Sequence, residues 1–352
     1  MGSIRFMLAL SVLAFHSGLP VLGPFAVYLF YFLSGYSIYA ALHKIHTDGT
    51  SYLNFWRKRF NRLIPFYLFV ALGVISLFSF VNIVVPDQLD KLTPRPENFQ
   101  NIDVASIFKN LLPTLYFSGS DLQLNPSVFY VPPWWSVVME IGFYLTLFVL
   151  VVTLKKLTWA LEFMTLLFLI LHFVFVVRSG QDLGALNSLV YFNWFGTFIF
   201  FLIGAIVRKY RSASFNSTKL KSISQLIVVF VLFLFSTFVT DPTQIFNGLP
   251  VIGYFVIVYL LMTLMLFYVM SLNYFPVNSS VDNRFAILSY RIYVSQSIAF
   301  PILILFETNI IAVSSFYRFA LVTLISVGIS LIPDIFLMLK KILNVNVARF
   351  ER

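Results

Sequence analysis

Two ionisable side chains in the first apolar stretch have the types and spacing of a functional pair. Arg5 and His16 are 11 positions apart, and at 3.6 residues per turn this spacing puts both on one helix face, about 16 Å apart along the axis. Imidazole is the side chain best suited to move a proton near neutral pH, so His16 is a candidate general base or nucleophile. The alternative is a histidine that only pairs with neighbours inside a helix bundle.

A carboxylate lies at a similar depth in a later apolar stretch. Ser136, Glu140 and Tyr144 recur at every fourth position and therefore share one helix face. Because Glu140 lies about as deep as His16, we expect the two to meet in one cavity. The Trp-Trp pair at 134–135 needs no chemistry to explain it, since aromatic side chains anchor helix ends at the membrane surface.

Cations crowd the segment before the third apolar stretch, at 57–59 and at Arg62. Arg59 and Arg62 are about one turn apart, and a guanidinium group binds phosphate through a bidentate fork, so a polyanionic ligand would suit them. The alternative is that a cytoplasmic loop simply collects cations, which anionic headgroups stabilise. The small residues at 34–35, in the middle of the second stretch, favour close helix packing.

The composition shows which kind of protein must position these side chains. The chain of 352 residues is 59% hydrophobic and only 11% charged, with 42 Phe, no Cys and a net charge of +10. Soluble domains have roughly 45–50% apolar and about 25% charged residues. A soluble enzyme, a nucleic-acid-binding domain and a disordered chain are therefore excluded, and so are disulfides and thiolate metal sites.

Apolar runs of about 20 residues, the length that crosses a bilayer, occur ten times. We therefore predict an all-α, polytopic integral membrane protein with about ten transmembrane helices. The predicted spans are 4–22, 24–42, 62–85, 133–154, 157–178, 188–207, 222–240, 249–271, 284–306 and 310–339.

The distribution of Lys and Arg predicts the orientation of these spans. With the N-terminus inside, 18 of the 24 cations fall in segments on the inner side and only four on the outer side. This asymmetry satisfies the positive-inside rule, so both termini should be cytoplasmic.

We expect one transmembrane domain over residues 1–352. It would include an outer loop at about 86–132 and a short or disordered cytoplasmic tail at about 342–352. Within the loop, 107–117 is apolar but too short to cross the bilayer, so we expect it either to lie in the membrane interface or to dip back into the membrane. A signal peptide is the alternative for 1–20, but His16 interrupts its apolar run and no typical cleavage site follows.

With these residues in view, the chain resembles the bacterial acyltransferase-three family, integral-membrane enzymes that O-acetylate surface polysaccharides and related glycans. The resemblance covers nearly the whole chain, and its specificity comes from several weak motifs in one order. These motifs are Arg-x10-His at 5–16, Phe-Tyr-Phe-Leu-Ser-Gly-Tyr at 30–36, Arg-x2-Arg-Leu-x-Pro-x-Tyr at 59–67, Trp-Ser-x3-Glu-x3-Tyr at 135–144 and Leu-Ser-Tyr-x2-Tyr at 288–293.

The resemblance implies roles for individual residues. His16 would be the catalytic histidine and Glu140 the acidic residue of the site, while Arg5, Arg59 and Arg62 would bind the acyl-CoA donor. The residues expected to contact substrate are Trp135, Ser136, Tyr144, Tyr290 and Gln296.

The chain departs from the family pattern in two places. Many members have a second histidine where this chain has Gln296, and glutamine cannot titrate. Many also end with a Glu-Pro element, whereas here Pro333 precedes Asp334. We also expect none of the extracellular hydrolase-like domains that some members carry, so acceptor delivery would fall to the membrane domain or to separate polysaccharide-assembly proteins.

The resemblance leads us to expect an O-acetyltransferase of the bacterial inner membrane, with acetyl-CoA as donor, no metal, and no nucleic-acid partner. His16 would deprotonate an acceptor hydroxyl or carry the acetyl group itself, and Glu140 would orient the imidazole. The acceptor would be a surface glycan or its lipid-linked precursor. A glycan or lipid-intermediate flippase is the main alternative, although no inverted repeat is visible, and a structural or sensory membrane protein is a third.

Overall fold

The computed structural model describes residues 1–19, 23–48, 51–85, 131–153, 159–179, 193–210, 279–306 and 314–350. The secondary-structure elements assigned in these ranges are all α-helices, so the all-α prediction holds for this part of the chain. The helices are α1 (Gly2–His16), α2 (Gly23–Asp48), α3 (Tyr52–Val84), α7 (Trp134–Thr153), α8 (Ala160–Ser179), α10 (Trp194–Tyr210), α14 (Ser279–Phe306) and α15 (Ser315–Phe350).

Each of these helices overlaps one of the predicted spans. The two remaining predictions, 222–240 and 249–271, lie outside the described residues, as does the predicted outer loop at about 86–132 apart from 131–132. The predicted tail at about 342–352 is helical as far as Phe350, as the end of α15, and 351–352 are outside the described residues. By length and composition, four described helical segments can cross a membrane: Phe25–Ile45, Tyr52–Val84, Ser280–Leu305 and Ser315–Met338. The total of ten spans and the sides of the two termini stay predictions.

The helix α3 begins ten residues before the apolar run that predicted it. Ser51 caps it, because its side chain accepts a hydrogen bond from the backbone N–H of Leu53 at 3.2 Å. The cationic turns that follow are good helix formers, so the helix continues through them into the apolar run. This extension holds Arg59 and Arg62 rigidly on the helix that also lines the core.

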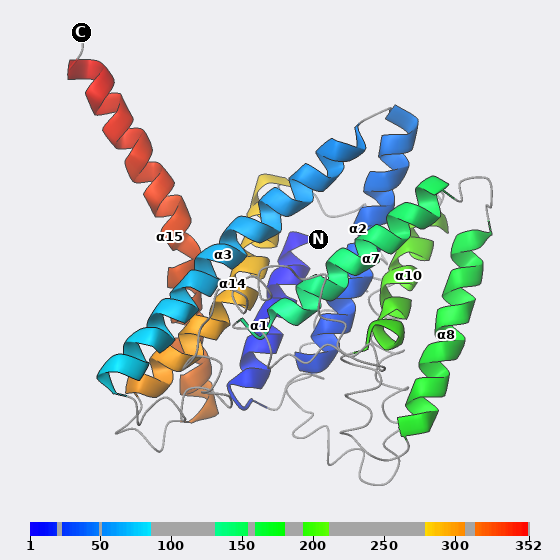
Figure 1. Cartoon of the computed structure of the whole chain (residues 1–352), viewed down its shortest axis with the longest axis horizontal. Helices are drawn as coiled ribbons and strands as arrows, with labels where there is room; N and C mark the ends of the chain where they lie inside the picture. The colour runs from blue at the N-terminus through cyan, green and yellow to red at the C-terminus, as the bar shows by residue number, and fades with distance from the viewer. Residues whose placement is uncertain are drawn as a thin grey trace, which may run out of the picture.

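The described helices run alternately in opposite directions, as Figure 1 shows. The helix α1 lies between α2 and α14 and packs against both, and α15 lies along α14. Ala9, Val12 and Leu13 of α1 are almost fully buried. The first helix is therefore a packed part of the bundle, as a retained span would be.

The helices α2 and α10 pack closely against each other. A Cβ added at Gly35 would lie 1.9 Å from the carbonyl oxygen of Phe201, and one added at Gly204 would lie 2.0 Å from that of Phe32. Each glycine thus admits the backbone of the opposite helix, which confirms the packing role predicted at 34–35 for Gly35.

The Trp-Trp pair at the start of α7 does not lie at the surface of the bundle. Trp134 is fully buried and stacks on Tyr67 of α3, with ring centroids 3.7 Å apart, and Trp135 is also buried. The interpretation as a membrane-surface anchor is therefore wrong for Trp134, because packing of α7 on α3 accounts for its position.

Candidate functional site

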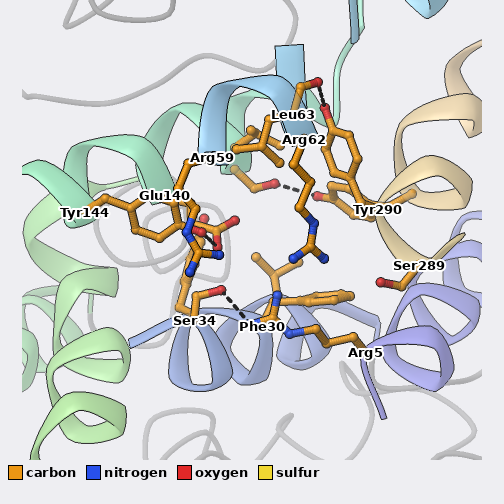
Figure 2. A pocket seen from close by; sticks show the side chains of 15 residues that line it. Arg5, Phe30, Ser34, Arg59, Arg62, Leu63, Glu140, Tyr144, Ser289 and Tyr290 are labelled. Atoms are coloured by element: carbon orange, nitrogen blue, oxygen red, sulfur yellow. Dashed lines mark hydrogen bonds between the residues drawn. The ribbon is translucent and has the colours of Figure 1, made fainter. Parts of the chain in front are cut away.

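One pocket receives side chains from α1, α2, α3, α7 and α14 (Figure 2). All five sequence motifs contribute to its wall, although they are spread over almost 290 residues of sequence. The lining residues are Arg5, Val27, Phe30, Tyr31, Ser34, Arg59, Arg62, Leu63, Ser136, Val137, Glu140, Tyr144, Ser289, Tyr290 and Tyr293.

Three guanidinium groups point into this pocket (Figure 2). They belong to Arg5, Arg59 and Arg62, and the described wall contains a single carboxylate, Glu140. The pocket is therefore electropositive, and its polar groups suit an anion with several oxygen atoms.

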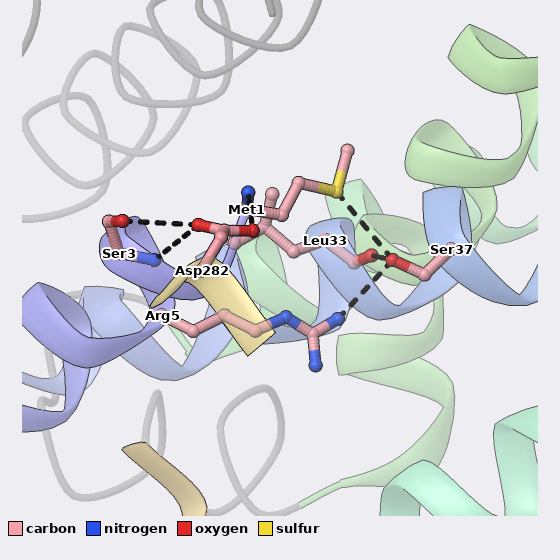
Figure 3. A network of polar contacts seen from close by, with 6 residues as sticks. All are labelled: Met1, Ser3, Arg5, Leu33, Ser37 and Asp282. Atoms are coloured by element: carbon pink, nitrogen blue, oxygen red, sulfur yellow. Dashed lines mark hydrogen bonds and ion pairs between the residues drawn. The ribbon is translucent and has the colours of Figure 1, made fainter. Parts of the chain in front are cut away.

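Arg5 is held by small polar residues of α2. Its Nη2 atom donates to Ser34 at 3.3 Å and is 3.5 Å from the hydroxyl of Ser37. The start of α1 is fixed in turn by Asp282 of α14, whose Oδ1 atom accepts hydrogen bonds from the backbone N–H of Ser3 at 3.0 Å and from its hydroxyl at 3.1 Å (Figure 3). The amino group of Met1 is 2.7 Å from the other oxygen of that carboxylate. These contacts fix the position of Arg5 along the bundle and the direction in which its side chain points.

Arg59 and Arg62 project from the capped extension of α3. The Arg59 guanidinium lies over the rings of Phe55 and Tyr144, 5.6 Å and 6.0 Å from their centroids. Arg62 donates from Nη2 to the carbonyl oxygen of Ala286 at 2.8 Å. Its Nε atom is buried and has no hydrogen-bond partner among the described residues, so Arg62 keeps a donor available for a ligand.

Glu140 and Tyr144 form a pair within α7. The phenol of Tyr144 donates a hydrogen bond to Oε1 of Glu140, as the spacing of four residues on one helix face permits. This bond fixes the carboxylate beside Arg59, whose guanidinium lies over the same tyrosine ring (Figure 2).

Two tyrosines of α14 join the pocket to α3 and α7. The hydroxyl of Tyr290 donates to the carbonyl oxygen of Leu63 at 2.6 Å, and that of Tyr293 is 2.9 Å from the hydroxyl of Ser136. Ser136 also donates to the carbonyl oxygen of Pro133 at 3.0 Å, so Tyr293 is the donor in the Ser136 pair. Both tyrosines thus have fixed orientations in the wall.

His16 stands apart from this pocket. It is the last residue of α1, its side chain is exposed, and its ring lies beside those of Phe15 and Phe300, with centroids 5.6 Å and 6.4 Å away. The expectation that His16 and Glu140 meet in one cavity is not met here, because Glu140 lines the pocket with Tyr144 as its partner and His16 does not line it.

The remaining predicted substrate residues lie just behind the pocket wall. Trp135 is buried. Gln296 is buried too, and its Nε2 atom donates to the carbonyl oxygen of Tyr293 at 2.8 Å. Its Oε1 atom has no hydrogen-bond partner among the described residues. The geometry brings Arg5, Arg59, Arg62, Ser136, Glu140, Tyr144 and Tyr290 together in the pocket, while Trp135, Gln296 and His16 stay outside its lining.

Several lining residues were not singled out from the sequence. Ser34 was assigned to packing, and Phe30, Tyr31, Ser289 and Tyr293 were given no individual role. All five nevertheless belong to the two motifs at 30–36 and 288–293, so the motifs themselves were the signal that could have identified them.

The pocket encloses about 60 Å³. This is room for a few water molecules or one small anion, because a site needs roughly 10–15 Å³ by the same measure to hold one water. Among the described residues there is no group of three or more His, Asp or Glu that could hold a metal ion.

Comparison with known proteins gives one match. A family model described as an acyltransferase domain, of the acyltransferase-three type, matches residues 2–334, which is nearly the whole chain and includes every residue of the pocket. Searches of the curated proteins and of the solved structures found no match.

Proposed function

The chain belongs to this family of membrane acyltransferases, and from that premise we propose that it transfers an acetyl group from cytoplasmic acetyl-CoA to a hydroxyl of a surface polysaccharide or its lipid-linked sugar precursor. The bacterial inner membrane is the proposed location, with membrane lipid and polysaccharide-assembly proteins as its surroundings.

The convergence of all five motifs on one electropositive pocket carries the proposal. A charged side chain placed at the centre of a bilayer costs about 2.5–3.5 kcal/mol on insertion scales, so such groups are rarely kept there without a function. Three arginines gathered around one carboxylate therefore indicate a ligand, and its charge must be negative. The phosphates of coenzyme A meet this requirement.

The two ends of α1 suit a long donor molecule. Arg5 and His16 are on one continuous helix, about 16 Å apart along its axis. Acetyl-CoA also has its phosphates at one end and its thioester at the other, joined by the narrow pantetheine arm. In the proposed complex Arg5, Arg59 and Arg62 bind the phosphate end, and the thioester extends towards His16.

At the thioester, His16 acts as a general base in the proposed reaction. Its imidazole takes the proton of the acceptor hydroxyl as that oxygen attacks the acetyl carbonyl carbon. The carbon–sulfur bond then breaks, and the leaving CoA thiolate receives the proton from the imidazolium. In the alternative order of steps, His16 first attacks the acetyl carbonyl carbon and the CoA thiolate leaves. The acceptor hydroxyl then takes the acetyl group from the imidazole.

Glu140 takes a different role from the one expected of it. Its partner is Tyr144 and it faces the arginines, so we assign it to balancing their charge and orienting Arg59 rather than to orienting the imidazole. Glu140→Gln should therefore change donor binding more than it changes proton transfer.

Binding of acetyl-CoA to the purified chain tests the proposal and separates it from a flippase. We expect saturable binding by isothermal titration, competed by free coenzyme A and lost when Arg59 and Arg62 are both replaced by glutamine. A flippase has no reason to bind acetyl-CoA, so absence of binding to the folded wild-type chain would contradict the proposal. Mass spectrometry of the surface glycan from strains with and without the gene would then identify the acceptor.

A further inference from the structure

A second and larger cavity lies on the outside of the bundle, where α3, α14 and α15 meet. It encloses about 1060 Å³, the size of sites that take drug-sized or larger ligands. We call it the lateral groove, and it is lined by 58, 61–62, 65–66 and 69 of α3, 283, 286–287 and 290–291 of α14, and 332–333 and 336–337 of α15.

Most of the wall of the lateral groove is apolar and faces outward. Phe336 is 67% exposed and Ile332 46% exposed, and Ile287 and Phe69 are exposed as well. In a membrane protein such a surface meets lipid. The cavity shows that this surface is hollowed between α3, α14 and α15. A flexible hydrocarbon chain is the occupant that an outward-facing apolar groove of this volume accommodates.

One end of the lateral groove carries positive charge. Lys58 and Arg62 lie there on successive turns of α3, and neither has a carboxylate within ion-pair distance among the described residues. The third cation, Arg291, is already neutralised, since its two terminal nitrogens lie 2.7 Å and 3.2 Å from the oxygens of Asp334. The amide of Asn61 adds a neutral polar group beside Lys58.

We propose that the lateral groove binds an anionic phospholipid of the surrounding membrane, with its phosphate at Lys58 and Arg62 and an acyl chain along Phe66, Ile332 and Phe336. Two cations with no carboxylate partner among the described residues lie at one end, and exposed apolar walls form the rest, which matches the two parts of such a molecule. A free phosphate would leave the apolar walls uncovered, and a neutral lipid would leave the two cations unpaired.

The lateral groove also touches the electropositive pocket between α1, α2, α3, α7 and α14. Arg62 and Tyr290 belong to both walls, and Tyr290 is fixed by its bond to the carbonyl oxygen of Leu63. A phosphate held at Arg62 from the groove side would fix the guanidinium that also faces the pocket. The bound lipid would thus stabilise one wall of the donor site.

Native mass spectrometry of the full chain tests the proposal. The chain is purified from mixed micelles that contain equal amounts of phosphatidylglycerol and phosphatidylcholine, which share their acyl chains and differ in headgroup charge. We expect one retained phosphatidylglycerol per chain and several-fold less phosphatidylcholine. Replacement of Lys58 by glutamine should lower that retention about fivefold, because one cation near an anionic headgroup contributes on that scale.

Two matched controls make the result specific. Arg57 is the neighbouring exposed cation and does not line the groove, so Arg57→Gln should retain lipid as the wild type does. Ile332→Trp should fill the groove and displace the lipid with both cations intact, whereas Leu324→Trp, on an exposed part of α15 outside the groove, should not.

Three results would overturn the proposal. The first is equal retention of the two lipids, and the second is an equal loss in the Lys58 and Arg57 variants. The third is a lipid-free dimer, which would make the groove an interface between copies of the chain. Because lipid retention is measured without donor or acceptor, it fails or succeeds independently of the proposed acetyl transfer.

Discussion

The two ends of α1 differ in how far their functional side chains are enclosed by other helices. At its start, Arg5 is enclosed by α2, α3, α7 and α14, and two serines of α2 fix its guanidinium. At its end, His16 is exposed, and the ring contacts that the structure describes for it are with Phe15 and Phe300. The positive charge of the pocket is therefore assembled by tertiary packing, whereas the imidazole is supplied by one helix end. Donor binding and proton transfer should separate in variants of the two ends.

The largest effect should come from the His16 end. His16→Ala should lower acetyl transfer by about 10²–10⁴-fold, the usual contribution of a positioned general base, with acetyl-CoA affinity unchanged. Turnover and titration of the same purified sample measure the two quantities. His43→Ala, which removes an exposed histidine of α2, is the control. Acetyl transfer at the wild-type rate in the His16 variant would remove this residue from the mechanism. The difference between the two ends of α1 would then have no catalytic consequence.

Variants at the pocket end of α1 should change the affinity for acetyl-CoA. Arg59→Gln should weaken acetyl-CoA binding by about tenfold or more, because a hydrogen bond to a charged group contributes about 1.5–3 kcal/mol. The affinity of the Arg59→Lys variant should lie between those of the wild type and of Arg59→Gln. Lysine keeps the charge but loses the bidentate hydrogen bonding of the guanidinium and the contact with the ring of Tyr144. Arg57→Gln should bind as the wild type does. If donor affinity stayed unchanged while turnover fell, the pocket would belong to the chemical step instead.

Packing of α2 on α10 should matter to the pocket end of α1 and not to its His16 end. Gly35→Ala places a methyl group against the carbonyl oxygen of Phe201, so α2 must move and carry Ser34 with it. We expect a loss of about 1–3 kcal/mol in the free energy of unfolding and weaker donor binding. Gly328→Ala meets no atom within 4 Å and should be neutral or stabilising by up to about 1 kcal/mol. Thermal unfolding in detergent compares the two, and equal melting temperatures would argue against the tight contact.

The smallest effect should come from the bond that holds Arg5. Ser34→Ala removes the nearer of the two hydroxyls beside its guanidinium, and a single hydrogen bond contributes about 0.5–1.5 kcal/mol. Donor affinity should therefore fall only a few-fold, with the turnover of bound substrate unchanged. Ser11→Ala, whose hydroxyl bonds only within α1 to the carbonyl oxygen of Met7, is the matched control. A larger loss in the Ser11 variant than in the Ser34 variant would contradict the role given to Arg5.

The helices themselves were largely predictable. Apolar runs of bilayer length locate a helix without knowledge of its neighbours, and the described helices all overlap predicted runs. The start of α3 was missed by ten residues, because hydropathy detects the apolar part of a helix and not the cationic turns after the Ser51 cap. The role of Trp134 was missed because the sequence does not show which helix covers it.

The sequence alone determined the all-helical membrane character, the acyltransferase resemblance that the family model confirms, and most of the residues that carry charge into the pocket. These depend on composition, order and local periodicity, which the chain carries at each position. Only the tertiary structure decided that Glu140 pairs with Tyr144, that Ser34 holds Arg5, and that His16 lies outside the pocket. The physical reason is that helix periodicity fixes which residues share a face, while the rotation and depth at which two faces meet depend on side-chain packing across the whole bundle.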